Sequence, residues 1–385
     1  MVMKKYLFVF LVVNITQAVS VWAQPALTDS HATAAASNLY AGLHRIAEKG
    51  CLFGHQDDLA YGVNWRYQPG RSDVKDACGD YPAVYGYDLG GIENEGAERN
   101  LDGVPFKKIR QFIREGFERG GVITLSWHLN NPVFAGKSAW DTTRGTVEAL
   151  LPGASHHQQF KEWLDRVADY VSSLKASNGT PIPVLFRPFH ELTGNWFWWG
   201  KNNCSADAFK TLYRFVVYYL REVKQLHQLV LVYNTSDNFS TADEFLERYP
   251  GDDVVDLISF DSYQYGDSTA NAWYRDKLIH LFTILAPVGK AHQKPIALAE
   301  TGFETIPSSN WWTTVVLPAV TCQPVSYVLV WRNHGLASWN NKMHYYAPYT
   351  GHPSVPDFIQ FYQHKKTLFE KDAAAEKLYQ HVIIQ

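Results

Sequence analysis

The chain has 385 residues, of which 46% are apolar and 15% aromatic, and its formal net charge is −3. This apolar content is enough for a large folded core and argues against a disordered chain. The nearly balanced charge gives no basic patch, which argues against nucleic acid as a partner. A chain of this length fits one large domain or two ordinary ones.

The first 23 residues have the pattern of a signal peptide. Lys4 and Lys5 precede a short apolar run that ends at Val13, and small residues at the usual cleavage spacing lead up to Ala23. The run is too short to span a membrane. An N-terminal strand of a cytosolic protein fits these flanks less well. We therefore expect export, to a periplasm or to the medium, and one folded domain over residues 24–385.

The cysteine count bears on both disulfides and metals. Four cysteines lie at positions 51, 78, 204 and 322. In an exported protein an even number permits disulfides, with three possible pairings. Cys51 and Cys78 are nearest in sequence and are our first expectation for a pair. No cysteine has the spacing of a metal ligand, and we predict no metal site.

Eight apolar, β-branched runs recur along the chain, and several show little alternation, as in strands that are buried on both faces. They are Cys51–Gln56, Ala83–Asp88, Val122–His128, Val184–Glu191, Leu229–Thr235, Val254–Tyr263, Ile296–Glu300 and Tyr327–Asn333. Between them, Phe106–Arg119, Phe160–Lys175 and Ala208–Lys224 have the apolar period of a helix. We expect one further helix before the first strand, within 30–48, and a last helix over Asp357–Phe369. Eight strand and helix units predict an α/β fold, a closed (β/α)8 TIM barrel.

Almost every run ends in polar or aromatic residues. The ends are Gly54-His55-Gln56-Asp57, Tyr87-Asp88, Trp127-His128, His190-Glu191, Asn234-Thr235, Asp261-Ser262-Tyr263, Glu300 and Trp331-Arg332-Asn333. Barrel enzymes build their active sites at the C-terminal ends of the strands, so these ends predict an active site at that face.

Two of these ends supply a glutamate, Glu191 on the fourth predicted strand and Glu300 on the seventh. Strands four and seven lie nearly opposite across the mouth of a barrel, and two such carboxyls are what cleavage of a glycosidic bond requires. The stretch 194–200 follows Glu191 and is dense in aromatic residues. Four bulky neighbours, 196–199, cannot all point inward, and flat rings suit stacking on sugars.

The stretch Phe-Arg-Pro-Phe-His-Glu…Gly-Asn-Trp-Phe-Trp-Trp-Gly over 186–200, with Ala-Glu-Thr-Gly at 299–302, resembles glycoside hydrolase family 26. The family consists mainly of β-1,4-mannanases with a (β/α)8 barrel. The resemblance implies a retaining β-1,4-mannanase that hydrolyses mannan, galactomannan or glucomannan by double displacement. It implies that Glu191 is the acid/base and Glu300 the nucleophile, and this chemistry needs no cofactor.

The resemblance also implies that eight residues bind substrate. They are His128, His190, Trp196, Asp261, Tyr263, Trp331, Arg332 and Trp140. Tyr263 is expected to donate its hydroxyl to Glu300, and His190 to help hold the geometry of that nucleophile. Trp331 would form an apolar floor under the sugar at the cleavage point. Arg187 is expected to be structural and to pair with a carboxylate at the rim.

Other polar residues have less specific patterns. His55 either lines the cleft or is a buried core histidine. Glu93, Glu95 and Glu98 are most simply a solvated acidic loop. The connections 57–80 and 132–158 are where family members differ, so their contribution to substrate binding stays open.

Three functions fit the sequence. The first is an endo-acting mannanase, and the second is an exo-acting mannobiohydrolase with the same chemistry and one end of its cleft blocked by a loop. The third is a non-catalytic β-glycan-binding barrel, which would not need a matched acid and nucleophile. Another β-glycan, such as a mixed-linkage glucan or a β-1,3-xylan, is a further option, since related barrels reuse this site. We expect a monomer that binds β-mannan or manno-oligosaccharides, without nucleic acid or membrane partners.

Overall fold

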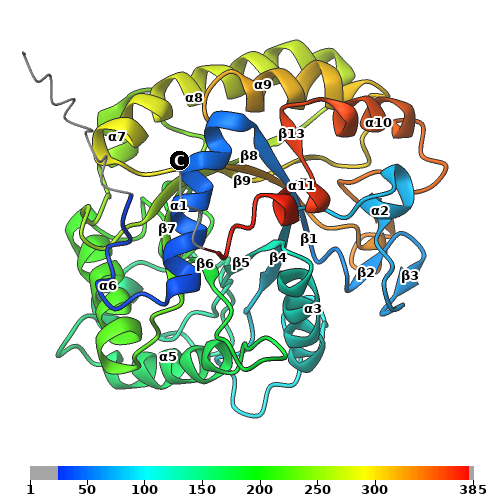
Figure 1. The fold of residues 1–385 in the computed structure, drawn as a ribbon. Coiled ribbons are helices and arrows are strands. Elements are labelled where there is room, and N and C mark those ends of the chain that lie inside the picture. Colours follow the sequence, from blue (N-terminus) through cyan, green and yellow to red (C-terminus); the bar gives the residue numbers. More distant parts are fainter. Residues whose placement is uncertain (1–24, 381–385) are drawn as a thin grey trace, which may run out of the picture.

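Eight parallel strands close into a barrel in the computed structural model, which describes residues 25–380. Strand β10 pairs with both β9 and β1, which closes the sheet. The barrel strands are β1 (Cys51–Gln56), β4 (Val84–Asp88), β5 (Val122–Ser126), β6 (Val184–Arg187), β7 (Leu229–Ser236), β8 (Leu257–Gln264), β9 (Ile296–Phe303) and β10 (Tyr327–Val330). Each predicted run overlaps one of these strands, so the (β/α)8 prediction is confirmed (Figure 1). The predicted signal peptide lies outside the described residues.

Helices surround the barrel and bury the faces that their apolar period predicts (Figure 1). In α5, for example, the buried residues include Phe160, Leu164 and Val167. The surrounding helices are α2 (Asp73–Cys78), α3 (Phe106–Glu118), α4 (Thr146–Leu150), α5 (His157–Ser172), α6 (Ala206–Tyr218), α7 (Ala242–Leu246), α8 (Asn271–His292), α9 (Leu317–Thr321) and α10 (Val355–Gln363). Among the described residues, no helix is long and apolar enough to cross a membrane.

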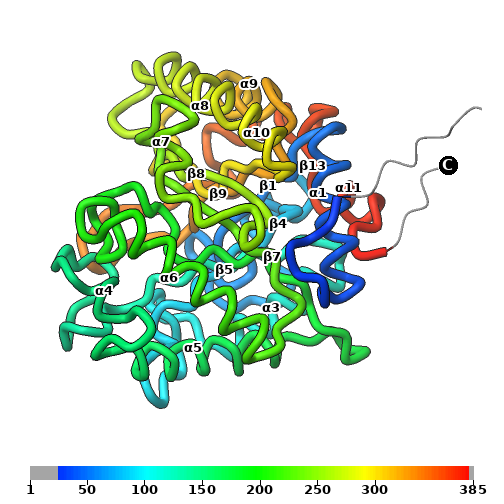
Figure 2. Tube along the Cα trace, turned by 90° about the vertical axis from the view of Figure 1, so that its left-hand side faces the viewer, coloured from blue at the N-terminus to red at the C-terminus, as the bar shows by residue number. Residues whose placement is uncertain are grey.

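Helix α1 (Ala34–Lys49) covers the N-terminal end of the barrel. Its residues Leu39, Leu43 and Ile46 are fully buried in one cluster with side chains from the inside of the barrel, such as Leu52 and Val230. Both views place α1 on the same side of the molecule as α11 (Glu370–Ala375) (Figures 1 and 2). With this end covered, a substrate reaches the barrel from the C-terminal ends of the strands.

The prediction of a last helix over Asp357–Phe369 is wrong in its second half. Helix α10 ends at Gln363, and the chain then forms a short strand, β13 (Thr367–Leu368), which pairs with the start of β1. The hydroxyl of Thr367 bonds to the carbonyls of Phe361 and His364. This bonding satisfies carbonyls at the end of the helix and favours its termination there.

The expectation of a disulfide between Cys51 and Cys78 is also wrong. All four cysteines are free thiols in the structure. Cys51 lies fully inside the core on β1, whereas the thiol of Cys78, at the end of α2, donates to the carbonyl of Asp80 at 3.5 Å. Burial raises the pKa of the Cys51 thiol well above its ordinary value, so this side chain behaves as a small apolar residue.

Two hairpins extend from neighbouring strands at the C-terminal end of the barrel. The connection after β1 contains β2 (Tyr61–Gly62) and β3 (Trp65–Arg66), and the connection after β10 contains β11 (Gly335–Ala337) and β12 (Lys342–His344). The hairpins meet where Arg66 Nη2 lies 3.1 Å from His334 Nε2. They therefore form one continuous wall beside the β1 and β10 ends.

Candidate active site

The two predicted glutamates come together at the C-terminal end of the barrel. Glu300 lies in β9 and Glu191 follows β6, and one carboxylate oxygen of each lies within 4.8 Å of the other. This spacing fits the roughly 5 Å of retaining glycosidases better than the ~6.5–9.5 Å of inverting ones. Phe189 and Glu191 have φ values of 55° and 54°, in the left-handed region. Non-glycine residues adopt it at a cost of about 1–3 kcal/mol, and such strain gathers at functional sites.

Both carboxylate oxygens of Glu300 accept hydrogen bonds from the protein. Arg187 Nη2 donates to Oε1 at 2.5 Å, and the Tyr263 hydroxyl donates to Oε2 at 2.8 Å, as the sequence led us to expect. Arg187 thus pairs with a carboxylate at the rim, also as expected. The two donors hold the Glu300 carboxyl in one orientation, as a nucleophile requires.

Asp261 lies on β8 directly beside Glu300 on β9. It is 2% exposed, and one of its oxygens accepts from Arg187 Nη1 at 3.3 Å. Burial and the neighbouring Glu300 raise the pKa of Asp261 well above its ordinary value. Asp261 therefore acts here as a support for Arg187 and Glu300. The three carboxyls of Glu191, Asp261 and Glu300 have the spacing of a cation site, but Arg187 already contacts two of them with its own positive charge.

Glu191 has the properties of a general acid. Burial first, and then the charge of Glu300, raise its pKa to about 7, while a 2.6 Å hydrogen bond from Trp196 Nε1 opposes the rise. Its carboxyl therefore keeps a proton in neutral solution for a large part of the time. A carboxylic acid tuned to this range can protonate a leaving oxygen near neutral pH.

The aromatic stretch after Glu191 is mostly core. Trp196 is 42% exposed, whereas Phe197, Trp198 and Trp199 are at most 2% exposed. Trp199 Nε1 donates to the carbonyl of His190 at 2.8 Å, and Trp198 Nε1 donates to the carbonyl of Leu129 at 3.2 Å. Only Trp196 of these four is available for stacking on a sugar, and the other three hold the strand ends in place.

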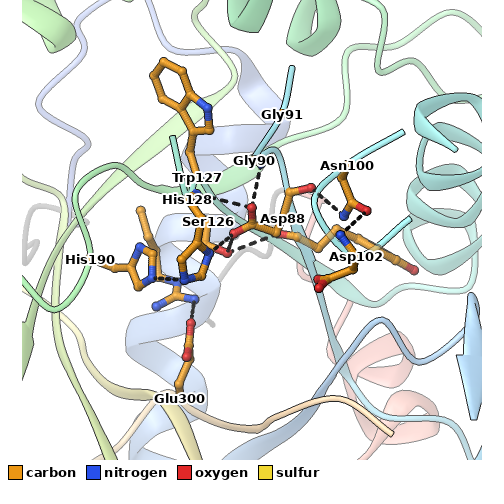
Figure 3. Close-up of polar contacts among 12 residues, drawn as sticks. Asp88, Gly90, Gly91, Asn100, Asp102, Ser126, Trp127, His128, His190 and Glu300 are labelled. Carbon is orange, nitrogen blue, oxygen red and sulfur yellow. Dashed lines mark hydrogen bonds and ion pairs between the residues drawn. The ribbon is translucent and has the colours of Figure 1, made fainter. Parts of the chain in front are cut away.

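His128 and His190 lie together on the floor of the site (Figure 3). Their Nε2 atoms are 3.1 Å apart, and His128 Nδ1 is 2.7 Å from Asp88 Oδ2. The described contacts of His190 do not include Glu300, so the expectation that His190 holds the nucleophile is corrected. The side chains that donate to the Glu300 carboxylate are Arg187 and Tyr263. Asp88 was not predicted as a site residue, although it stands at a strand end like the others.

Trp140 and Trp331 border the same histidine. The Trp140 ring lies parallel to His128, with centroids 5.0 Å apart and planes at 16°, and it is 53% exposed. Trp331 is half-buried, with its ring 6.4 Å from that of His128. The structure thus brings both predicted tryptophans to the floor where a sugar at the cleavage point would lie.

Arg332 lies at the other side of the site, toward the two hairpins. It forms an ion pair with Asp102, contacts the Tyr61 hydroxyl at 3.4 Å, and packs 5.7 Å from the Trp339 ring. Nearby, burial and the charge of Asp102 raise the pKa of Asp57 to about 8. This polar group is separate from the two catalytic candidates and fits hydroxyl recognition.

Burial decides between the two roles of His55 and corrects the expectation for Glu93. His55 is fully buried and bonds to Asp58 at 2.7 Å, so it is a core histidine. Glu93 is not solvated as expected: it is 1% exposed and accepts from Trp127 Nε1 at 3.0 Å and from the backbone N–H of Asn130 at 2.8 Å. It joins the loops after β4 and β5. Glu95 and Glu98 are exposed, as expected.

The sequence of this chain matches one known enzyme family. Residues 28–298 match the profile described as glycosyl hydrolase family 26, which is more than half of the chain. The chain belongs to glycosyl hydrolase family 26. The mannan endo-1,4-beta-mannosidase of Bifidobacterium adolescentis is 32% identical over 362 residues, 89% of this chain. That alignment spans only 35% of the Bifidobacterium protein, so the chain corresponds to about a third of that relative's length.

Solved structures of the family match most of the chain. A GH26 beta-mannanase from Bacteroides ovatus is 46% identical, with a TM-score of 0.85 over 91% of this chain and 98% of that one. A modular endo-beta-1,4-mannanase from Cellulomonas fimi is 32% identical, with a TM-score of 0.78 over 90% of this chain and 78% of that one. These likenesses agree with the (β/α)8 barrel.

Proposed function

We propose that the protein is a retaining β-1,4-mannanase in which Glu191 is the acid/base and Glu300 the nucleophile. The observation that supports this most is the pairing of two carboxyls within 4.8 Å whose surroundings differ. Glu300 accepts hydrogen bonds from Arg187 and Tyr263, and Glu191 has a pKa raised to about 7. Two carboxyls with opposite protonation at one pH are the acid and the nucleophile of a retaining glycosidase.

The first step forms a covalent glycosyl ester. The Glu300 carboxylate attacks the anomeric carbon, and the bond from that carbon to the glycosidic oxygen breaks. The leaving oxygen takes its proton from Glu191, which becomes a carboxylate. Formation of the ester removes the negative charge of Glu300, and with it one of the two causes that raise the pKa of Glu191.

The second step releases the sugar. Glu191, now ionised, removes a proton from a water molecule as the water oxygen attacks the anomeric carbon. The ester bond to Glu300 breaks, and both glutamates return to their starting states. Two inversions at the same carbon give net retention. Trp196 keeps the Glu191 carboxyl in place through both steps by its 2.6 Å hydrogen bond.

The substrate proposal rests on the named relatives, which are mannan endo-1,4-beta-mannosidases, and on the aromatic and polar lining of the site. Trp140, Trp196 and Trp331 offer ring faces, and Arg332 with Asp102 offers charged hydrogen-bonding groups beside them. We propose β-1,4-linked mannan or manno-oligosaccharides as the substrate. We also propose that the enzyme is exported, because its first 23 residues have the pattern of a signal peptide.

An exo-acting enzyme that releases mannobiose is the second candidate. The observation that favours it is the wall formed by the two hairpins beside Arg332, which meet at Arg66 and His334. A wall at one end of a cleft limits the number of sugar units that bind on that side. The endo and exo forms share all the chemistry at Glu191 and Glu300.

The test is a time course of products from linear mannan and from mannohexaose, with Glu300→Ala beside the wild type. A spread of oligosaccharides indicates endo action, whereas mannobiose alone from the earliest time indicates exo action. The first-formed reducing end, followed by proton NMR, should be the β-anomer. An α-anomer, or a folded Glu300→Ala protein with near-normal rate, would contradict the proposed roles.

A further inference from the structure

Asp88 is a buried carboxylate in the floor of the site that the reaction scheme does not use. It ends β4, has no exposed surface, and accepts four hydrogen bonds from neighbouring groups. Oδ2 accepts from Ser126 Oγ at 2.5 Å and from His128 Nδ1 at 2.7 Å. Oδ1 accepts from the backbone N–H groups of Gly90 at 2.6 Å and of His128 at 3.2 Å (Figure 3).

These contacts restrict the protonation of His128. Its Nδ1 faces a carboxylate, so Nδ1 must carry a proton. Its Nε2 faces Nε2 of His190 at 3.1 Å, and one of these two nitrogens must be a donor and the other an acceptor. The tautomer of His190 therefore follows from the charge of His128, and that charge depends on Asp88.

The charges around the pair favour one of the two arrangements. Burial opposes a charge on His128, but the carboxylate of Asp88 outweighs it, and the pKa of His128 is raised, with Glu300 and Asp102 adding to the rise. Burial first, and then the charge of His128, lower the pKa of His190 well below its ordinary value. The favoured arrangement is a charged His128 that donates from Nε2 to a neutral His190.

We propose that Asp88 is a positioning residue that orients His128 and, through it, fixes the donor pattern of His190 next to the acid/base Glu191. Asp88 does not touch the sugar, because its side chain has no exposed surface. It acts through two rings that form the floor, and Figure 3 shows His128 between Asp88 and His190. The inference rests on the proposed function, since it assigns a role within that reaction.

The loop after β4 is folded closely around this carboxylate. A Cβ at Gly90 would lie 2.5 Å from Leu101 Cδ2 and 2.8 Å from both Asp88 Oδ1 and the His128 carbonyl oxygen, so only glycine fits. Asn100 Nδ2 donates to the backbone carbonyl of Asp88 at 3.0 Å. The close fit holds the Asp88 carboxylate in one position.

The same asparagine connects Asp88 to the Arg332 side of the site. Its Oδ1 accepts from the backbone N–H of Asp102 at 3.0 Å, and the Asp102 side chain forms the ion pair with Arg332. Asp88 therefore lies between the histidine floor and the Arg332 group. A displacement of the Asp88 side chain would therefore disturb the groups on both sides of a bound sugar.

The charge of His128 also affects the pKa of the acid/base Glu191. His128 lowers the pKa of Glu191, against the rise caused by burial and by Glu300. The titratable and charged groups around His128 are Asp88, Asp102, His190, Glu191 and Glu300. Loss of the Asp88 carboxylate would leave His128 neutral over more of the pH range, and the pKa of Glu191 would rise. The alkaline limb of the pH profile of kcat/KM reports this acid, so it should shift to higher pH.

The test compares Asp88→Asn with Ser126→Ala, which removes a hydrogen bond to the same oxygen and leaves the contact to His128. Ring-nitrogen NMR follows the titration of His128, and kinetics on mannohexaose give kcat and KM between pH 4 and pH 9. We expect Asp88→Asn to lower kcat about 10- to 150-fold with little change in KM, the size expected for one hydrogen bond to a charged group. The midpoint of the His128 titration should move to lower pH, and the alkaline limb of the kcat/KM profile should move to higher pH.

Ser126→Ala should keep the wild-type His128 midpoint and most of the activity. A folded Asp88→Asn protein with unchanged kcat and an unchanged His128 midpoint would overturn the inference. If Asp88→Asn does not fold, ring-nitrogen NMR of the wild type tests the inference. A His128 ring that is neutral at pH 6, or that lacks a proton on Nδ1, would refute the inference. Wild-type turnover of mannohexaose is measured separately, so a failure of the proposed function is recognised independently of Asp88.

Discussion

Arg187 donates a 2.5 Å hydrogen bond to Oε1 of Glu300, and neither side chain is more than 4% exposed. The same guanidinium reaches Asp261 at 3.3 Å and Asn234 Oδ1 at 2.7 Å. A buried arginine must be paired because an isolated charge in the core is costly. Burial opposes its charge, yet the two carboxylates outweigh that effect and raise the pKa of Arg187 above its ordinary value. Arg187 is thus a permanent cation beneath the nucleophile.

Replacement of Glu300 should change the titration of Glu191. Glu300→Gln keeps the shape and removes the negative charge, which is the second cause of the raised pKa of Glu191 after burial. The pKa of Glu191 should therefore fall from about 7 toward its ordinary value, and hydrolysis should drop by several orders of magnitude. Carbon NMR of the labelled glutamate carboxyls measures the first effect. A Glu191 midpoint that stays where it is would show that burial alone sets it.

Removal of the Tyr263 hydroxyl should slow the reaction without unfolding the protein. Tyr263→Phe deletes the 2.8 Å hydrogen bond to Oε2 of Glu300 and leaves the bond from Arg187 in place. A hydrogen bond to a charged group contributes about 1.5–3 kcal/mol, so kcat/KM should fall roughly 10- to 150-fold. The matched control is Tyr274→Phe, whose hydroxyl bonds to the Ser262 carbonyl and to Thr301 instead of to a carboxylate. Equal losses in both variants would argue against a role of Tyr263 at the nucleophile.

The sequence was enough to predict the barrel, the positions of its strands and both glutamates, because these depend on the local pattern of apolar and polar residues. The apolar runs are buried on both faces, and Glu191 and Glu300 follow such runs directly. The burial of Phe197, Trp198 and Trp199 could not be predicted, because it depends on distant partners such as the carbonyl of Leu129.

The buried contacts of the charged residues Asp88 and Glu93 could not be predicted for the same reason. Both were visible as polar residues near the end of a predicted strand, but single-residue polarity suggested solvent exposure for Glu93. Its buried position depends on donors from Gly91, Trp127 and Asn130, which only the folded loops bring together. The role of Asp88 depends in the same way on His128, 40 residues away in sequence.

The pKa of Asp57 predicts a particular pH dependence of stability. Burial and the charge of Asp102 raise it to about 8 in the folded protein, far above the value of about 3.9 in an unfolded chain. The folded state therefore holds this proton more tightly, and the stability that it contributes is fully present below about pH 4. That contribution is lost as the pH rises from about 4 through 8.

Asp57→Asn should remove this loss, because asparagine has no proton to release and its oxygen can still accept the hydrogen bond from Tyr61. We expect the variant to be more stable than the wild type at pH 8 and closer to it at pH 5, by urea unfolding at both pH values. Equal gains at the two pH values would show that Asp57 is ionised in the folded protein over this range.

A second buried ion pair, at the N-terminal end of the barrel, should contribute to stability and not to catalysis. Arg221 is 4% exposed and donates to Asp256 Oδ2 at 2.6 Å and to Thr28 Oγ1 at 2.6 Å. Asp256 is fully buried and also accepts from the backbone N–H of Leu231 at 2.8 Å. Arg221→Met leaves that carboxylate buried without its cation, which costs about 3–5 kcal/mol of unfolding free energy.

Arg214→Met is the matched control, because Arg214 pairs with Asp253 at 2.6 Å but both side chains are largely exposed. Exposed ion pairs contribute at most about 1 kcal/mol, because water screens the charges. Urea unfolding should therefore show a loss for Arg221→Met several times that for Arg214→Met. Activity per folded molecule should stay near wild type in both, because the strand starts lie opposite the mouth of the barrel. Similar losses in the two variants would mean that Asp256 keeps enough hydrogen bonds, or gains enough water, to stay stable without its arginine.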